Sequence, residues 1–240
     1  MLLQHLTRQR LEREASARVR RRRVADTPCG PRQLIGGDEG GAHAVLNFAS
    51  NDYLGLANHP AVVAALAEGA RRWGAGSGAS HLVSGHSRAH AVLEGELASL
   101  LVPWVPDAHA LLFCSGYMAN LALLTTLGGG EAAIFADKLN HASLIDAGLL
   151  AEGRMRRYPH GRLDLLEAML NECSQPLRLI VTDAVFSMDG DLADLPALLA
   201  LAERHDAWLI IDDAHGFGVL GTHGAGTLAH YDLRSERLIY

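Results

Sequence analysis

The stretch that decides the fold is residues 208–216, with the sequence WLIIDDAHG. Its apolar run predicts a strand buried on both faces, as parallel strands are when helices cover the sheet. The strand ends abruptly in two carboxylates, a histidine and a glycine. Because side chains alternate along a strand, Asp212 and Asp213 are expected on opposite faces. One of them can face a ligand crevice at the carboxyl edge of the sheet, or either can cap the following turn.

Strand and helix patterns alternate through the sequence before this stretch. The strands are expected at residues 110–114, 132–136, 154–158, 177–183 and 207–212, and the helices near 117–127, 142–152, 162–173 and 195–205. Such a βαβ series predicts an α/β fold with a mainly parallel sheet flanked by helices. Residues 237–240 begin a further strand pattern, and the sequence ends within it.

The amino-terminal third has a different organisation. A helix is expected over residues 2–23, followed by a Pro- and Gly-containing segment at 28–41. A short strand is expected at 45–49, and the further helices are expected to reach from Pro60 to Trp73 and over 89–101. We therefore predict an amino-terminal basic helix and linker over residues 1–41, and a large domain over 42–240 that is truncated in mid-strand.

Composition excludes several classes of protein. The chain has 240 residues and 49% hydrophobic content, enough for a substantial core. It has no apolar run long enough for a bilayer and no secretory signal pattern, so no membrane partner is expected. Its three cysteines are far apart and form no CxxC pair, and no HExxH pattern occurs, so neither a disulfide framework nor a metal site is expected. A cytoplasmic location fits best.

The net charge of −6 is unevenly distributed, because residues 1–32 carry +6 and the remainder −12. Four arginines stand together at 20–23. Glu12 and Glu14 argue against an organelle presequence, and no aromatic residue is interleaved to stack on nucleic-acid bases. A solvated helix end is favoured over nucleic-acid binding. A third possibility is an anion site for a carboxylate or phosphate, which the planar arginine fork binds with two hydrogen bonds.

Polar residues follow several of the expected strands. Ser115-Gly116-Tyr117 opens a helix, whose free N–H groups and dipole suit a phosphate, although Ser115 can simply cap that helix. His141 can present its ring to a flat ligand, act as a base or cap a helix. Ser187 offers a hydroxyl group on a turn. The glycine-rich residues 74–80 follow a helix, not a strand, which argues against a nicotinamide site.

These motifs, taken in order, resemble the pyridoxal-phosphate (PLP)-dependent α-oxoamine synthases, which have the aspartate aminotransferase fold, type I. The segments that carry the resemblance are residues 50–56, 76–78, 83–85, 93–97, 140–143, 185–190 and 212–216. The resemblance extends from about residue 10 to the end of the chain. It implies PLP as the cofactor, a homodimer, and a small carboxyl-terminal domain that this sequence lacks.

The resemblance also implies roles for individual residues. Asp212 would bind the pyridine nitrogen and keep it protonated. His141 would stack on the ring, and Ser187 and His215 would bind its phenolic oxygen. Ser115, Gly116 and Tyr117 would hold the phosphate. Two residues would contact substrates: Asn51 the amino acid, and Arg20, as one of four candidates in the arginine run, the distal carboxylate of the acyl chain.

The reaction that the resemblance implies is the decarboxylative condensation of L-alanine with a pimeloyl thioester, on coenzyme A or a carrier protein, in biotin biosynthesis. Glycine C-acetyltransferase, 5-aminolevulinate synthase and a non-catalytic partner subunit of this fold remain alternatives. The family's Schiff-base lysine is expected beyond Tyr240, and the only lysine here, Lys138, has no special position. We therefore expect the chain to be an amino-terminal part that is inactive by itself, since a missing base costs roughly 10²–10⁴-fold in rate.

Overall fold

The computed structural model describes residues 1–20, 22–36 and 41–240. The chain divides into two compact units, Met1–Arg71 and Arg72–Tyr240. The division at residue 41 that composition indicates stays a prediction. Arg21 of the arginine run and residues 37–40 of the expected linker lie outside the described residues.

The first unit contains a helix, α1 (Leu2–Ala15), whose residues are all exposed, and an antiparallel sheet in the order β1-β2-β3. The strands are β1 (Val24–Ala25), β2 (Arg32–Gly36) and β3 (His43–Leu46), and helix α2 (Pro60–Trp73) continues into the second unit. The expectation of a helix to residue 23 is wrong. The Ser16 hydroxyl group donates to the carbonyl of Glu12 at 2.7 Å, and Ala17 adopts a left-handed φ of 53°, which ends the helix.

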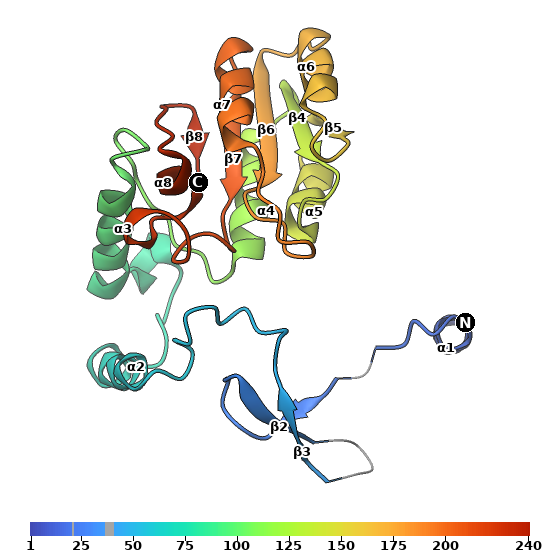
Figure 1. Cartoon of the computed structure of the whole chain (residues 1–240), viewed down its shortest axis with the longest axis vertical. Helices are drawn as coiled ribbons and strands as arrows, with labels where there is room; N and C mark the ends of the chain where they lie inside the picture. The colour runs from blue at the N-terminus through green and yellow to red at the C-terminus, as the bar shows by residue number, and fades with distance from the viewer. Residues whose placement is uncertain (21, 37–40) are drawn as a thin grey trace. The chain divides into compact units, whose positions relative to one another are not determined.

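The second unit is built around a five-stranded sheet in the order β5-β4-β6-β7-β8, in which every pairing is parallel (Figure 1). Its strands are β4 (Ala132–Asp137), β5 (Arg154–Tyr158), β6 (Leu177–Asp183), β7 (Trp208–Asp212) and β8 (Leu238–Ile239). The parallel sheet predicted from the βαβ series is therefore confirmed. Its central strand β6 is almost wholly buried, as expected when both faces are covered.

Helices cover both faces of this sheet. They are α4 (Gly116–Leu127), α5 (Ala142–Leu150), α6 (Leu163–Asn171), α7 (Leu195–Arg204) and α8 (Gly226–Tyr231). One core joins Ile210 of β7 to residues of α4 and α5, and the other joins Leu209 and Ile211 to residues of α6, α7 and α8. Successive side chains of β7 thus point alternately into the two apolar cores on either side of the sheet. This alternation also fixes the face of the sheet toward which each of the next residues points.

The strand expected at residues 110–114 is a second correction. This segment is neither helix nor strand, and it pairs with no strand among the described residues. The backbone N–H of Leu112 instead donates to the carboxylate of Glu94 at 3.2 Å. Glu94 belongs to α3 (Arg88–Leu101), which follows a short π-helix at His81–Gly85. An apolar run alone does not make a strand, because a strand needs a hydrogen-bonding neighbour.

The order of the strands places a topological switch point between β4 and β6. The chain leaves β4 for β5 at the sheet edge and then returns past β4 to form β6. Connections therefore diverge between β4 and β6, and ligands of open α/β sheets bind where such a divergence occurs. No helix of the described residues combines the length and apolar composition needed to cross a bilayer.

Candidate active site

Asp212 and Asp213 point to opposite faces of the sheet, as the alternation predicts. Asp212 Oδ2 accepts a hydrogen bond from the side-chain amide of Asn120 in α4 at 2.7 Å. Asp213 instead accepts hydrogen bonds from the backbone N–H of Thr227 at 2.8 Å and from the Tyr240 hydroxyl group. Burial raises the pKa of the Asp213 carboxyl group. Asp213 therefore secures the start of α8, and Asp212 is the acid on the α4 side.

Two intervening side chains connect Asp212 to His141. The amide nitrogen of Asn120 lies 2.7 Å from Asp212 Oδ2 and 2.9 Å from Ser143 Oγ, so its two hydrogens can serve both oxygens. Ser143 Oγ lies 2.7 Å from Nδ1 of His141, and the Ser143 backbone N–H donates to the same nitrogen at 3.2 Å. Nδ1 is therefore an acceptor, which places the ring proton on Nε2.

The backbone of the His141 loop is fixed to the end of β6. The N–H of His141 donates to Asp183 Oδ2 at 2.7 Å. The side chain of Asn140 donates to the Val181 carbonyl at 2.9 Å and accepts from the Asp183 N–H at 3.1 Å. Because these groups bridge β4 and β6, the imidazole of His141 is held at the point where the strand connections diverge.

Asp183 contributes an unusual charge environment to this edge. Its burial raises the pKa of the carboxyl group to about 7. The N–H of His141 opposes this shift, whereas the negative charges of Asp212 and Asp137 add to it. The site thus concentrates several carboxyl groups, a setting in which a cation or a protonated ring nitrogen is stabilised.

The amino terminus of α4 lies on the same side. Ser115 is the N-cap, and its hydroxyl oxygen accepts from the Met118 N–H at 3.3 Å. Its predicted role at a phosphate stays a prediction. Gly116 and Tyr117 lie in the first turn of α4, where the backbone N–H groups have no hydrogen-bond acceptor within the helix. The Tyr117 hydroxyl group donates to Asp146 of α5. Asn120 follows Gly116 by one turn, about 6 Å along the axis, so the helix start and Asp212 are close.

A cavity of about 520 Å³ reaches part of this site. Gly116 and Asn120 line it on the helix side, and Asp212 and Asp213 line it on the strand side. Apolar side chains make up much of the rest, including Leu111, Phe113, Leu123, Ile210 and Ile239. An apolar cavity with a few convergent polar groups is typical of a small-molecule site. A flat heterocycle with a phosphate at one end matches this combination of a carboxylate, apolar walls and a helix start.

The structure brings only some of the predicted site residues together. His215 lies half-buried in the turn after β7, and Ser187 is exposed in a loop closed by a bridge between Val185 and Leu192. Arg20 and Asn51 belong to the first unit and are exposed. Lys138 is also exposed, and its backbone N–H donates to the Tyr158 carbonyl at 3.1 Å. Within the described residues, no cluster of side chains suits a metal ion.

Asn120, Ser143 and Asp183 were not predicted to have a role. Asn120 and Asp212 are 92 residues apart in the sequence. Asp183 and His141 are 42 residues apart, and no local sequence pattern connects them. One signal was available for Asn120: it is the one amide side chain in the largely apolar helix α4 and is 9% exposed. A buried polar side chain needs a partner, so its presence on an apolar helix indicates a network.

The parallel sheet, its two helical layers and the polar network at its carboxyl edge define the PLP-dependent transferase fold of type I. The chain belongs to the aminotransferase class I and II family, whose model matches residues 43–237. The serine palmitoyltransferase of Sphingomonas wittichii has a TM-score of 0.85 and 29% identity, over 97% of this chain and 57% of that one. An 8-amino-7-oxononanoate synthase from Francisella tularensis has a TM-score of 0.66 and 33% identity, over 79% of this chain and 51% of that one.

Curated relatives are more similar in sequence. The 8-amino-7-oxononanoate synthase 2 of Polaromonas sp. strain JS666 is 68% identical over 240 residues, which is 100% of this chain and 59% of that protein. The 8-amino-7-oxononanoate synthase of Leptothrix cholodnii is 64% identical over 242 residues, again 100% of this chain and 59% of that protein. The chain thus spans about 59% of the length of these relatives.

Proposed function

We propose that this chain contributes the cofactor pocket of an 8-amino-7-oxononanoate synthase, an acyltransferase that condenses L-alanine with a pimeloyl thioester in biotin biosynthesis. The observation that carries the proposal is the hydrogen-bonded series Asp212, Asn120, Ser143, His141, of which Asp212 and Asn120 line an apolar cavity. The similarity to named synthases over the full length of the chain supports the same reaction.

PLP would be held at its two ends. Asp212 would accept a hydrogen bond from the pyridine nitrogen, and its carboxylate favours the protonated form. The N–H groups of Gly116 and Tyr117 would hold the phosphate at the start of α4, with the Ser115 hydroxyl group beside them. When bound, PLP supplies an electron-withdrawing ring that stabilises negative charge on the carbon next to the substrate nitrogen.

The remaining residues would orient the ring. His141 would stack on it, since hydrogen bonds to Ser143 and Asp183 fix both the tautomer and the backbone of that histidine. Ser187 and His215 would hydrogen-bond the phenolic oxygen. Asn120 would hold the Asp212 carboxylate in one orientation, because it donates to Oδ2 while the Ala214 N–H donates to Oδ1 at 3.0 Å. Two donors on one carboxylate limit its rotation.

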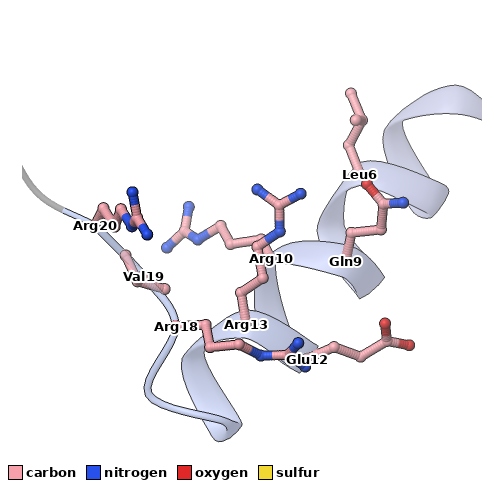
Figure 2. Close-up of a pocket in the computed structure, with 8 residues that line it drawn as sticks. All are labelled: Leu6, Gln9, Arg10, Glu12, Arg13, Arg18, Val19 and Arg20. Carbon is pink, nitrogen blue, oxygen red and sulfur yellow. The ribbon is translucent and has the colours of Figure 1, made fainter. Parts of the chain in front are cut away.

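The substrates belong to the same proposal. Asn51 would lie near the amino acid, and Arg20 would bind the distal carboxylate of the pimeloyl chain. Figure 2 shows Arg20 in the segment after α1, across a hollow of about 620 Å³ from Arg10 and Arg13. A hollow lined by several guanidinium groups favours an anion. The acyl carrier would be coenzyme A or a carrier protein, and the active protein a cytoplasmic homodimer.

The cofactor proposal is tested by titrating the purified chain with PLP and following the visible circular dichroism that a chiral pocket induces. The wild-type chain should bind PLP saturably, and Asp212→Asn should weaken binding at least about tenfold, because 1.4 kcal/mol of lost pairing is a factor of ten. Asp164→Asn, at an exposed acid of α6, is the matched control. Absence of an induced signal, or equal affinity of wild type and Asp212→Asn, contradicts the proposal.

The substrate class is tested by calorimetry on the PLP-loaded chain. Pimeloyl-CoA should bind more tightly than acetyl-CoA or succinyl-CoA, which are the thioesters of glycine C-acetyltransferase and 5-aminolevulinate synthase. Arg20→Gln should reduce this preference, since it removes the charge that pairs with the distal carboxylate. Arg8→Gln changes an arginine of α1 outside the hollow and should leave the preference intact. Equal binding of the three thioesters argues against the pimeloyl assignment.

A further inference from the structure

His160 follows β5, and both of its ring nitrogens contact carboxylates from other loops. Nδ1 lies 3.0 Å from Asp137 Oδ2 and Nε2 lies 2.7 Å from Asp191 Oδ2. The ring meets Phe186 edge-on, with 4.4 Å between centroids and an interplanar angle of 76°. An ionised carboxylate only accepts hydrogen bonds, so each nitrogen has to carry a proton for both contacts to form. The geometry therefore fits an imidazolium and not a neutral ring.

Asp137 connects this imidazole to the loop that carries His141. It is the last residue of β4 and is 3% exposed. While its Oδ2 faces His160, its Oδ1 accepts the N–H of Leu139 at 2.8 Å. The turn closed in this way leads directly to Asn140 and His141. The orientation of the Asp137 carboxylate thus fixes the approach to the ring-stacking residue.

Asp191 connects the same imidazole to the loop that carries Ser187. Its carbonyl oxygen accepts the N–H of Phe186 at 2.9 Å, and the N–H of Gly190 donates to the Phe186 carbonyl at 2.8 Å. These bonds close a short loop in which Ser187 is exposed. The carboxylate of Asp191 and the ring of Phe186 are the groups of that loop that contact His160.

We propose that His160 is a positioning residue, which, as an imidazolium between Asp137 and Asp191, holds the loop of His141 and the loop of Ser187 in a fixed relation. The importance of that relation for PLP rests on the proposed function. The bridge itself does not depend on it. His160 touches neither the cavity nor a proposed substrate, so its effect on the cofactor is exerted through the two loops.

The charges that face His160 come from the two bridging acids. Partial burial lowers the pKa of the imidazole, but the hydrogen bonds and negative charges of Asp191 and Asp137 outweigh this effect, and the pKa is raised. Tyr158, the last residue of β5, is buried and its pKa is raised as well, so it adds no charge near neutral pH. The bridge should therefore persist to a higher pH than an imidazolium without these two carboxylates would, and break in alkaline solution.

The first test is a long-range ¹H–¹⁵N spectrum of the chain labelled at histidine nitrogen. At pH 7.5 His160 should show two protonated ring nitrogens. His160→Gln assigns the signal, and Asp191→Asn should lower the titration midpoint of His160 without replacing the ring. A wild-type His160 that is neutral at pH 7.5 overturns the proposal.

The second test measures the loops by amide hydrogen exchange. His160→Gln should speed exchange at Leu139 and Gly190 about tenfold, and leave the sheet amide of Ile210 unchanged. His230→Gln is the matched control and should change none of these rates. Unchanged exchange in His160→Gln contradicts the proposal. Since neither test uses PLP, failure of the chain to bind PLP would overturn the proposed function and leave the bridge standing.

The third readout links the bridge to the cofactor. In a chain that binds PLP, His160→Gln should reduce the induced circular dichroism at saturation, because the ring would sit between less constrained loops. His230→Gln should give the wild-type signal. A full wild-type signal and affinity in His160→Gln would refute the positioning role even if the imidazolium is present.

Discussion

The amide nitrogen of Asn120 lies 2.7 Å from Oδ2 of Asp212 and within hydrogen-bonding distance of Ser143. The acid that ends β7 is thereby joined to the loop that follows β4, across the strand between them. A buried amide that serves two oxygens leaves neither free to rotate.

Asn120→Asp should disrupt the pocket, because it replaces a donor by an acceptor beside Asp212. We expect the unfolding free energy to fall by about 1–3 kcal/mol and PLP affinity by at least about tenfold. Urea unfolding and PLP titration measure the two effects. Asn171→Asp makes the same chemical change at the exposed end of α6 and should do neither. An Asn120→Asp chain with wild-type stability and affinity would show that the network is not needed.

Ser143→Ala should release the tautomer of His141. In the wild-type chain, ¹⁵N spectra should show an unprotonated Nδ1 and a protonated Nε2, since Ser143 provides both donors to Nδ1. Removing the hydroxyl group leaves only the backbone N–H at 3.2 Å, and a mixture of tautomers is expected. Ser187→Ala, at an exposed serine, is the control. A wild-type His141 protonated at Nδ1 would contradict the assigned hydrogen bonds.

Asp183→Asn should flatten the dependence of stability on pH. The pKa of Asp183 is raised to about 7, above its value in the unfolded chain. Its stabilising contribution is therefore complete below about pH 4 and is lost as the pH rises to 7. Wild-type stability should fall by roughly 2–4 kcal/mol more than that of Asp183→Asn across this window. Urea unfolding at several pH values tests this, and Glu131→Gln, at an exposed acid, should behave as wild type.

His160→Gln should lower the free energy of unfolding in acid solution and have little effect on it in alkaline solution. The pKa of His160 is raised, so its contribution is fully present below about pH 6.5 and is lost as the pH rises through the folded-state value. We expect a destabilisation of about 1 kcal/mol near pH 6, limited by solvent screening, that vanishes in alkaline solution. Thermal or urea unfolding at both extremes measures it. A destabilisation that is equal at both would indicate a packing defect and not a lost ion pair.

The sequence was sufficient to predict the parallel strands and four of the helices after residue 115. It did not predict α8 (Gly226–Tyr231), whose six residues are too few to show a helical period. It was insufficient at residues 110–114, where an equally apolar run finds no partner strand among the described residues. Asp212 and His141 could be proposed because they follow strands directly. Asn120 and His160 could not, since their partners come from distant segments and only the folded chain brings them together.

The most direct test of the account is a crystal structure of this chain with PLP. The account predicts that the pyridine nitrogen lies about 2.6–3.2 Å from the Asp212 carboxylate, within hydrogen-bonding distance. The phosphate should meet the N–H groups of Gly116 and Tyr117, and the ring should lie beneath His141. PLP bound elsewhere, or bound with its nitrogen turned away from Asp212, would contradict the central claim.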